Sequence, residues 1–151
     1  MMKTSTITIS SVFETTVAEM FPLLQQLRTL QTIAAPYATF QPLDGREELL
    51  WQPGQTFQFR LRLFGLVSFG VHTIEVVSFS PENILTHEGN PHVPVWNHRI
   101  TLEPLDDRTL RYTDQVEIGA GWKTPFVCLW ARLFYRHRQR GWRRLLSADA
   151  A

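Results

Sequence analysis

Residues 57–118 alternate between apolar and polar side chains over most of their length, and this pattern constrains the fold more than any other part of the sequence. The alternation begins with Phe57 and Phe59, which are separated by Gln58 and followed by Arg60. A period of two is typical of a strand with one buried and one solvated face. Further strand patterns follow at residues 66–79, 84–88, 95–103 and 110–118. Because only short turns separate them, we predict an antiparallel meander with one apolar face that another element must cover.

The segment before the meander predicts one strand and two short helices. Residues 4–11 alternate as a half-buried strand does, and Thr15 or Thr16 then offers an N-cap for a helix. Proline lacks the amide hydrogen that a helix interior needs, so we expect the helix to break at Pro22 and to restart. The second helix is expected to end before Pro36.

The last part of the sequence returns to helical spacing over residues 122–146 and predicts one long helix. Its apolar side chains share one sector of a helical wheel: Trp122, Phe126, Leu129, Trp130 and Leu133. We expect this stripe to face the sheet, because no other element is large enough to cover it. The predicted fold class is α+β: a strongly curved antiparallel sheet of six to seven strands wrapped around a long C-terminal helix, with two short helices after the first strand. Space between a curved sheet and its helix is a usual place for a small-molecule pocket.

Length and composition favour one folded domain. The chain has 151 residues, of which 44% are hydrophobic, which excludes a disordered chain. We expect residues 1–147 to form the domain and residues 148–151 a loose tail. The longest apolar run, residues 126–131, is far shorter than the roughly 20 residues that span a bilayer, and the N-terminus lacks the apolar core of a secretion signal. The single cysteine, Cys128, excludes an internal disulfide, and together these features predict a cytoplasmic protein.

Three short motifs extend this reading. They are Trp96-Asn97-His98, then Tyr-Thr-Asp-Gln-Val-Glu at residues 112–117, and Leu-Phe-Tyr-Arg-His-Arg at residues 133–138. Together with the order of elements, they resemble the START/SRPBCC superfamily, whose helix-grip fold is shared by lipid-transfer domains, birch-pollen-allergen-like proteins and polyketide cyclases. The resemblance covers nearly the whole chain and implies a START/SRPBCC-like domain with a ligand cavity. Such relatives often have a second histidine two residues after the first, whereas this chain has Ile100.

His98 and Asp114 are the candidate catalytic residues. They occupy neighbouring predicted strands and share the apolar face, so their side chains can meet. An aspartate in that place can orient an imidazole and hold its proton, as general acid–base catalysis requires. The pair can equally orient a ligand, or form a buried hydrogen-bonded pair without a further role.

The predicted ligand-binding residues are aromatic or polar side chains of the concave face and the terminal helix. They are Phe57, Phe59, His72, Trp96, His98, Tyr112, Asp114, Phe126 and Trp130. Most of them would have the same pattern as plain core residues. His72, His98 and His137 lack the spacing of metal ligands, and no phosphate-binding loop is present, so we expect neither a metal nor another cofactor.

Basic residues gather at the C-terminal end. Residues 132–151 contain six arginines against one aspartate, and Arg136, Arg140, Arg143 and Arg144 are the candidate surface contacts. Such a cluster suits an anionic membrane or a protein partner, although it is also compatible with a solvated helix end. Nucleic acid is not expected, because the arginines are spread around the helix and the rest of the chain is acidic on balance.

Three functional hypotheses remain after the sequence is read. The first is binding of a small hydrophobic molecule, such as a lipid, an isoprenoid or a polyketide-like ring, without an enzymatic reaction. The second is a cyclase/dehydratase-like enzyme that uses His98 with Asp114 as acid and base. The third is a module that docks on a membrane or a protein through the arginine-rich helix. Ile100 favours binding over catalysis, because the second histidine of a polar site is missing.

Overall fold

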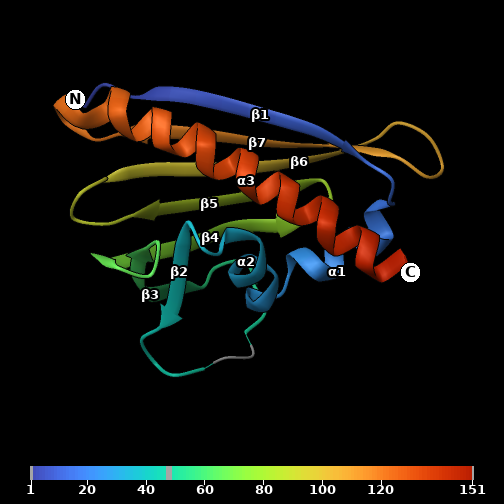
Figure 1. The fold of residues 1–151 in the computed structure, drawn as a ribbon, viewed down its shortest axis with the longest axis horizontal. Coiled ribbons are helices and arrows are strands. Elements are labelled where there is room, and N and C mark those ends of the chain that lie inside the picture. Colours follow the sequence, from blue (N-terminus) through green and yellow to red (C-terminus); the bar gives the residue numbers. More distant parts are fainter. Residues whose placement is uncertain (1, 47–48, 151) are drawn as a thin grey trace.

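The computed structural model describes residues 2–46 and 49–150 and consists of one sheet, two short helices and one long helix (Figure 1). Strand β1 (Ser5–Phe13) precedes helices α1 (Val17–Leu24) and α2 (Leu27–Ala34). The other strands are β2 (Ala38–Pro42), β3 (Thr56–Leu63), β4 (Val67–Ser80), β5 (Asn83–Gly89), β6 (Val95–Pro104) and β7 (Leu110–Gly119). A short 3-10 turn, η1 (Gly121–Lys123), leads into helix α3 (Thr124–Ala150).

The sheet has seven strands in the order β1-β7-β6-β5-β4-β3-β2, and all neighbouring pairs are antiparallel. Strands β3 to β7 form the predicted meander, β2 adds one more strand to it, and β1 returns to pair with β7. Register shifts between Arg60 and Arg62 and between Val76 and Ser78 interrupt the β3–β4 and β4–β5 ladders. Such irregularities bend a strand. Helix α3 lies across one face of the sheet, with α1 and α2 beside it (Figure 1).

The first helix differs from the prediction at Pro22, which lies inside α1 rather than at a break. The chain leaves helical geometry only at Gln26, whose backbone is extended. There Leu27 N–H donates to the Leu49 carbonyl and Trp51 N–H donates to the Gln25 carbonyl. Two short helices are present as predicted, but a distant segment that pairs with the backbone at Gln26 determines where they separate.

The buried face of α3 also differs from the prediction. Trp122, Phe126, Leu129 and Leu133, which were expected to face the sheet, are exposed to 81%, 69%, 60% and 46%. The buried face instead carries Ala131, Phe134, Tyr135, Arg138, Gln139 and Trp142. Arg138 and Gln139 are polar, so a wheel ranked by apolarity alone selects the wrong sector.

The expectation of a loose tail concerns residues 148–151. Residues 148–150 belong to α3, and Ala151 lies outside the described residues.

Replacing Trp142 with alanine is expected to lower the free energy of unfolding by about 3–5 kcal/mol, because this side chain is fully buried. Trp122→Ala is the control, because Trp122 is exposed in η1, the turn that leads into α3, and this variant should change that free energy by no more than about 0.5 kcal/mol. Urea unfolding followed by circular dichroism measures both. Equal losses in the two variants would contradict the assignment of the buried face of α3.

Candidate functional site

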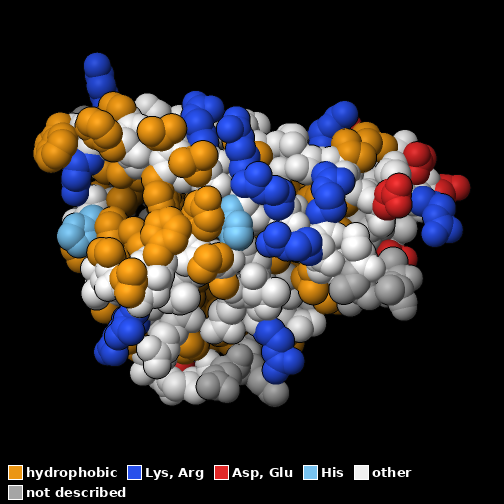
Figure 2. Space-filling view, in the orientation of Figure 1, with side chains coloured by type: hydrophobic (Ala, Val, Ile, Leu, Met, Phe, Trp, Pro, Cys, Tyr) orange, Lys and Arg blue, Asp and Glu red, His pale blue; other side chains and the backbone are white. Residues whose placement is uncertain are grey.

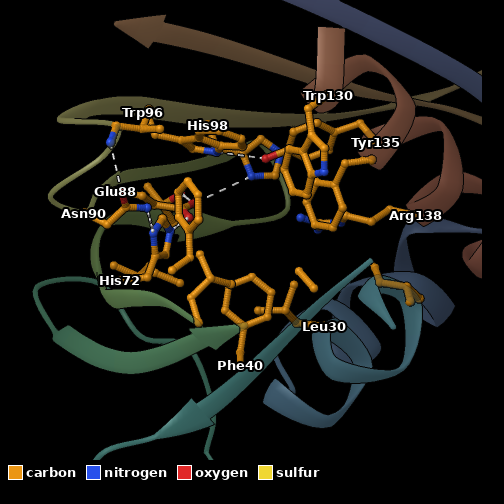
Figure 3. Close-up of a pocket in the computed structure, with 18 of the residues that line it drawn as sticks. Leu30, Phe40, His72, Glu88, Asn90, Trp96, His98, Trp130, Tyr135 and Arg138 are labelled. Atoms are coloured by element: carbon orange, nitrogen blue, oxygen red, sulfur yellow. Dashed lines mark hydrogen bonds and ion pairs between the residues drawn. The ribbon is translucent and has the colours of Figure 1, made fainter. Parts of the chain in front are cut away.

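A cavity of about 570 Å³ lies between the concave face of the sheet, α2 and α3. Its walls are mainly apolar and aromatic, and they include Leu30 from α2, Phe40 from β2, Trp96 from β6 and Trp130 from α3 (Figure 3). Trp122 and Phe126 also line it and are strongly exposed, so they mark its mouth. This volume and lining are typical of a pocket for a small organic molecule.

One wall of the cavity carries a hydrogen-bonded group centred on Glu88 of β5 (Figure 3). Its Oε1 lies 2.8 Å from His72 Nε2, and its Oε2 accepts a 2.6 Å hydrogen bond from Thr86 Oγ1. Asn90 Oδ1 accepts from the backbone N–H groups of His92 and Val93, so its amide nitrogen is the end that faces His72 Nδ1, at 3.1 Å. His72 Nδ1 is therefore an acceptor, and the ring proton on Nε2 is donated to Glu88.

His98 and Asp114 form a second group behind the first. His98 Nε2 lies 2.6 Å from Asp114 Oδ1, and both side chains are buried. Asp114 also accepts hydrogen bonds from the Tyr112 hydroxyl at 3.2 Å and from Gln139 Nε2 at 3.0 Å. Three donors thus surround this carboxylate. The other imidazole nitrogen, His98 Nδ1, lies 3.8 Å from Glu88 Oε2, so His98 stands between two carboxylates.

The surroundings of these groups set their protonation. Burial alone raises the pKa of the Asp114 carboxyl, but the hydrogen bond from His98 and the charges of His98 and Arg138 outweigh it and hold the pKa below its usual range. Burial likewise opposes ionisation of Glu88, and its contacts with His72 and His98 lower the pKa of that carboxyl. Both carboxylates are therefore ionised at neutral pH.

Two tyrosines beside the cavity keep their protons. Burial raises the pKa of the Tyr112 and Tyr135 phenols well above the usual value. The Tyr135 hydroxyl accepts a 3.0 Å hydrogen bond from Trp96 Nε1, which connects α3 to β6.

Five of the nine predicted ligand-binding residues line the cavity: His72, Trp96, His98, Phe126 and Trp130. The remaining four, Phe57, Phe59, Tyr112 and Asp114, lie outside its lining. The three aromatic residues among them pack against other aromatic side chains. Phe57 and Phe59 pack around Trp51, and Tyr112 packs between Phe13 and Trp142.

Asp114 is covered by the residues that donate to it, and His98 separates it from the cavity.

Sequence reasoning missed several polar residues of the lining, among them Thr86, Glu88 and Arg138. Strand parity carries a signal for the first two, because they alternate with exposed His87 and share the face of buried Ile84. Arg138 was counted only as one of the six arginines near the C-terminus, although its spacing of three and four residues from Tyr135 and Trp142 places it on the buried face.

The other arginines of α3 are exposed, including Arg136, Arg140, Arg143 and Arg144. They continue, toward the C-terminus, the exposed face that carries Phe126, Leu129 and Leu133 nearer the N-terminus. Figure 2 shows this division of the helix surface, with hydrophobic side chains over its first half and basic ones over its second half.

No cluster of three or more histidine, cysteine, aspartate or glutamate side chains suited to a metal ion occurs within the described part of the chain. Among residues 2–46 and 49–150, no helix combines the length and apolarity that crossing a membrane requires.

A curved seven-stranded antiparallel sheet around a long C-terminal helix, with two short helices after β1, defines the START-like helix-grip class. Many solved structures are similar to this chain, and three of them illustrate the likeness. Protein Ms6760 from Mycobacterium smegmatis has a TM-score of 0.72 at 16% identity, covering 95% of this chain and 92% of that one. A START superfamily protein from the same organism has a TM-score of 0.70 at 12% identity, covering 95% and 97%. Norcoclaurine synthase from Thalictrum flavum, in complex with dopamine and hydroxybenzaldehyde, has a TM-score of 0.66 at 10% identity, covering 97% and 88%.

At these identities the likeness establishes the fold, which is the START/SRPBCC fold. A family model described as "Domain of unknown function (DUF8410)" matches residues 5–146, so the chain belongs to that family. No curated protein matches the sequence.

Proposed function

We propose that this chain binds a small hydrophobic molecule in the cavity between the sheet and α3. The observation that carries the proposal is an apolar space of about 570 Å³ bounded by aromatic side chains of both elements. Burying an apolar molecule there contributes roughly 25 cal/mol for each Å² removed from water. The norcoclaurine synthase structure, which has the same fold, contains dopamine and hydroxybenzaldehyde, and this supports a ligand of the size of an aromatic ring system. A lipid chain, an isoprenoid or a polyketide-like ring are the candidate classes.

Reducing the volume of the cavity is expected to weaken binding of the ligand. Leu30 is half-buried and lines the cavity, so Leu30→Trp should weaken binding of the neutral fluorescent probe N-phenylnaphthylamine by about tenfold or more. Leu105→Trp is the matched control, because Leu105 is partly exposed and lies outside the cavity lining. Native mass spectrometry of freshly purified protein should show a bound hydrophobic molecule that Leu30→Trp lacks. Equal probe binding by the two variants would contradict the proposal.

A second candidate function is acid–base catalysis on the bound molecule. His98 gives its Nε2 proton to the Asp114 hydrogen bond, which leaves Nδ1 without a hydrogen bond to any described residue. In this proposal, Nδ1 takes a proton from an activated carbon of the ligand and leaves an enolate, and the imidazolium that forms is stabilised by Asp114 and Glu88. This is the cyclase/dehydratase-like role that the sequence suggested.

The catalytic proposal predicts deuterium exchange. In D2O, the wild-type protein should accelerate exchange of the methylene protons of the β-diketone benzoylacetone, as followed by proton NMR. His98→Gln should reduce that acceleration by about 100-fold, which is the usual contribution of one positioned base. His87→Gln is the control, because His87 is exposed. Equal acceleration by His98→Gln and the wild type would eliminate His98 as the base.

A third proposal concerns the exposed face of α3, which we expect to dock on an anionic lipid bilayer. Apolar Phe126, Leu129 and Leu133 can enter the interface, while the arginines that follow them reach anionic headgroups. Charge complementarity supports a bilayer, because residues 122–147 contain no acidic side chain. Trp122 and Phe126 belong both to this face and to the cavity mouth, so docking would direct the mouth toward the lipid.

Vesicle co-sedimentation tests this docking. The wild-type protein should bind vesicles that contain phosphatidylglycerol and not vesicles of phosphatidylcholine alone. Replacing Arg136 and Arg140 by glutamine should lower the affinity about 30-fold, because each basic residue near an anionic surface is worth about 1 kcal/mol. The control removes two arginines, Arg60 and Arg62, from the solvent face of β3. Equal binding to vesicles with and without phosphatidylglycerol would argue against the proposal. An equal loss of affinity in the Arg136/Arg140 and Arg60/Arg62 double variants would argue against it as well.

A further inference from the structure

The cavity has hydrogen-bond donors without acceptors. In the described part of the chain, three buried side-chain nitrogen atoms have no hydrogen-bond partner: Trp130 Nε1, Arg138 Nε and Trp142 Nε1. All three belong to α3, and all three residues line the cavity. A buried donor without a partner costs about 1–3 kcal/mol, and a charged one costs more. Trp142 packs against Tyr112, so Trp130 and Arg138 are the two residues of this wall whose donors a bound molecule can satisfy.

Arg138 is the strongest of these donors. Its side chain extends from α3 toward the cavity interior (Figure 3), and the residue is only 6% exposed. The guanidinium carbon lies 5.1 Å from the centre of the Tyr135 ring and 5.7 Å from that of Phe134. These rings hold the side chain in place, and in the described residues the guanidinium forms no ion pair and no hydrogen bond.

The carboxylates of the cavity wall do not need Arg138 as a partner. Glu88 already accepts from His72 and Thr86, and Asp114 accepts from three donors of its own. Both lie more than ion-pair distance from the guanidinium, so they act on it only as charges at longer range. The guanidinium hydrogens therefore remain open toward the cavity.

Tyr135 adds a further donor beside the same space. Its oxygen accepts the Trp96 indole hydrogen, and its own hydroxyl proton, which burial keeps in place, has no acceptor among the described residues. Trp130, whose Nε1 is also a donor, lies in the same helix between one and two turns before Tyr135. A cation and two neutral donors thus border one apolar cavity.

We infer that the molecule bound in the cavity is an amphipathic carboxylate, whose apolar part fills the space between sheet and helix and whose carboxylate pairs with Arg138. A carboxylate matches the planar fork of a guanidinium with two parallel hydrogen bonds, and its remaining lone pairs can accept from Tyr135 or Trp130. The inference rests on the proposed binding function and names the chemical class of its ligand.

Ligands with the same apolar part and different head groups show how much the head group contributes to binding. Binding is measured by quenching of the intrinsic tryptophan fluorescence, with two series of probes. One series is dodecanoate, dodecanol and dodecylamine, and the other is naphthylacetate and naphthylethanol. We expect the wild-type protein to bind each carboxylate at least tenfold more tightly than the corresponding alcohol, and dodecylamine more weakly than either.

Variants at Arg138 test whether this residue causes the preference for carboxylates. Arg138→Met keeps an apolar side chain of similar length and should weaken dodecanoate binding by about 10- to 100-fold, while dodecanol binding stays within about twofold. Arg138→Lys keeps the charge without the fork and should recover part of the preference. Arg136→Met is the control, because Arg136 is exposed on the same helix. Thermal unfolding without ligand should show Arg138→Met to be folded and no less stable, because an unpaired buried charge is removed.

Four outcomes would overturn the inference. Equal weakening of carboxylate and alcohol by Arg138→Met would mean that Arg138 only shapes the cavity. Preference of the wild type for dodecylamine would assign the head group to Glu88. If the wild type binds alcohols and carboxylates equally, the binding function stands and the carboxylate class fails, whereas binding of neither series removes both proposals.

Discussion

Helix α3 packs closely against α2 at Gly141. A Cβ atom built on Gly141 would lie 3.1 Å from both the Cα and the Cβ of Ile33, so only glycine allows the helices to approach this closely. The next residue, Trp142, is fully buried against Tyr112. This end of α3 is therefore fixed by dense packing, while the end near η1 borders the cavity mouth. The cavity runs along the helix from Trp122 and Phe126 at the mouth to Arg138 and Trp142 near the packed end.

The strands were predictable because side chains alternate between the two faces of a sheet. Once one residue of a strand is assigned to the buried face, the faces of all the others follow. Trp96 and His98 of β6 and Tyr112 and Asp114 of β7 are all buried, as simple alternation indicates. Their register, in which His98 stands opposite Val116, then follows from the hairpin that joins the two strands. Glu88 escaped this reasoning because a glutamate in a strand is usually assigned to water, although parity with Ile84 places it inside.

The long helix was predictable in extent but not in orientation. Its exposed face is more apolar over the first half than its buried face is over the second half, where Arg138 and Gln139 lie. The buried face of an amphipathic helix is normally predicted to be its most apolar sector. That rule fails when polar residues line a cavity and apolar residues are exposed at the surface. The same two departures are the features on which the carboxylate and bilayer proposals rest. Local rules thus failed at the residues to which we assign these proposed roles.

The two proposals on α3 also agree in geometry. Arg138 and Phe126 are twelve positions apart in the sequence, which is about 18 Å along a helix axis. A ligand whose carboxylate pairs with Arg138 would therefore extend its apolar part toward the mouth at Trp122 and Phe126. A bilayer presents its headgroups outward, so a protein docked with its mouth on that surface would receive an amphipathic molecule head group first. The carboxylate would then travel to the far end of the cavity, and the apolar part would exchange the bilayer for the aromatic walls without crossing water.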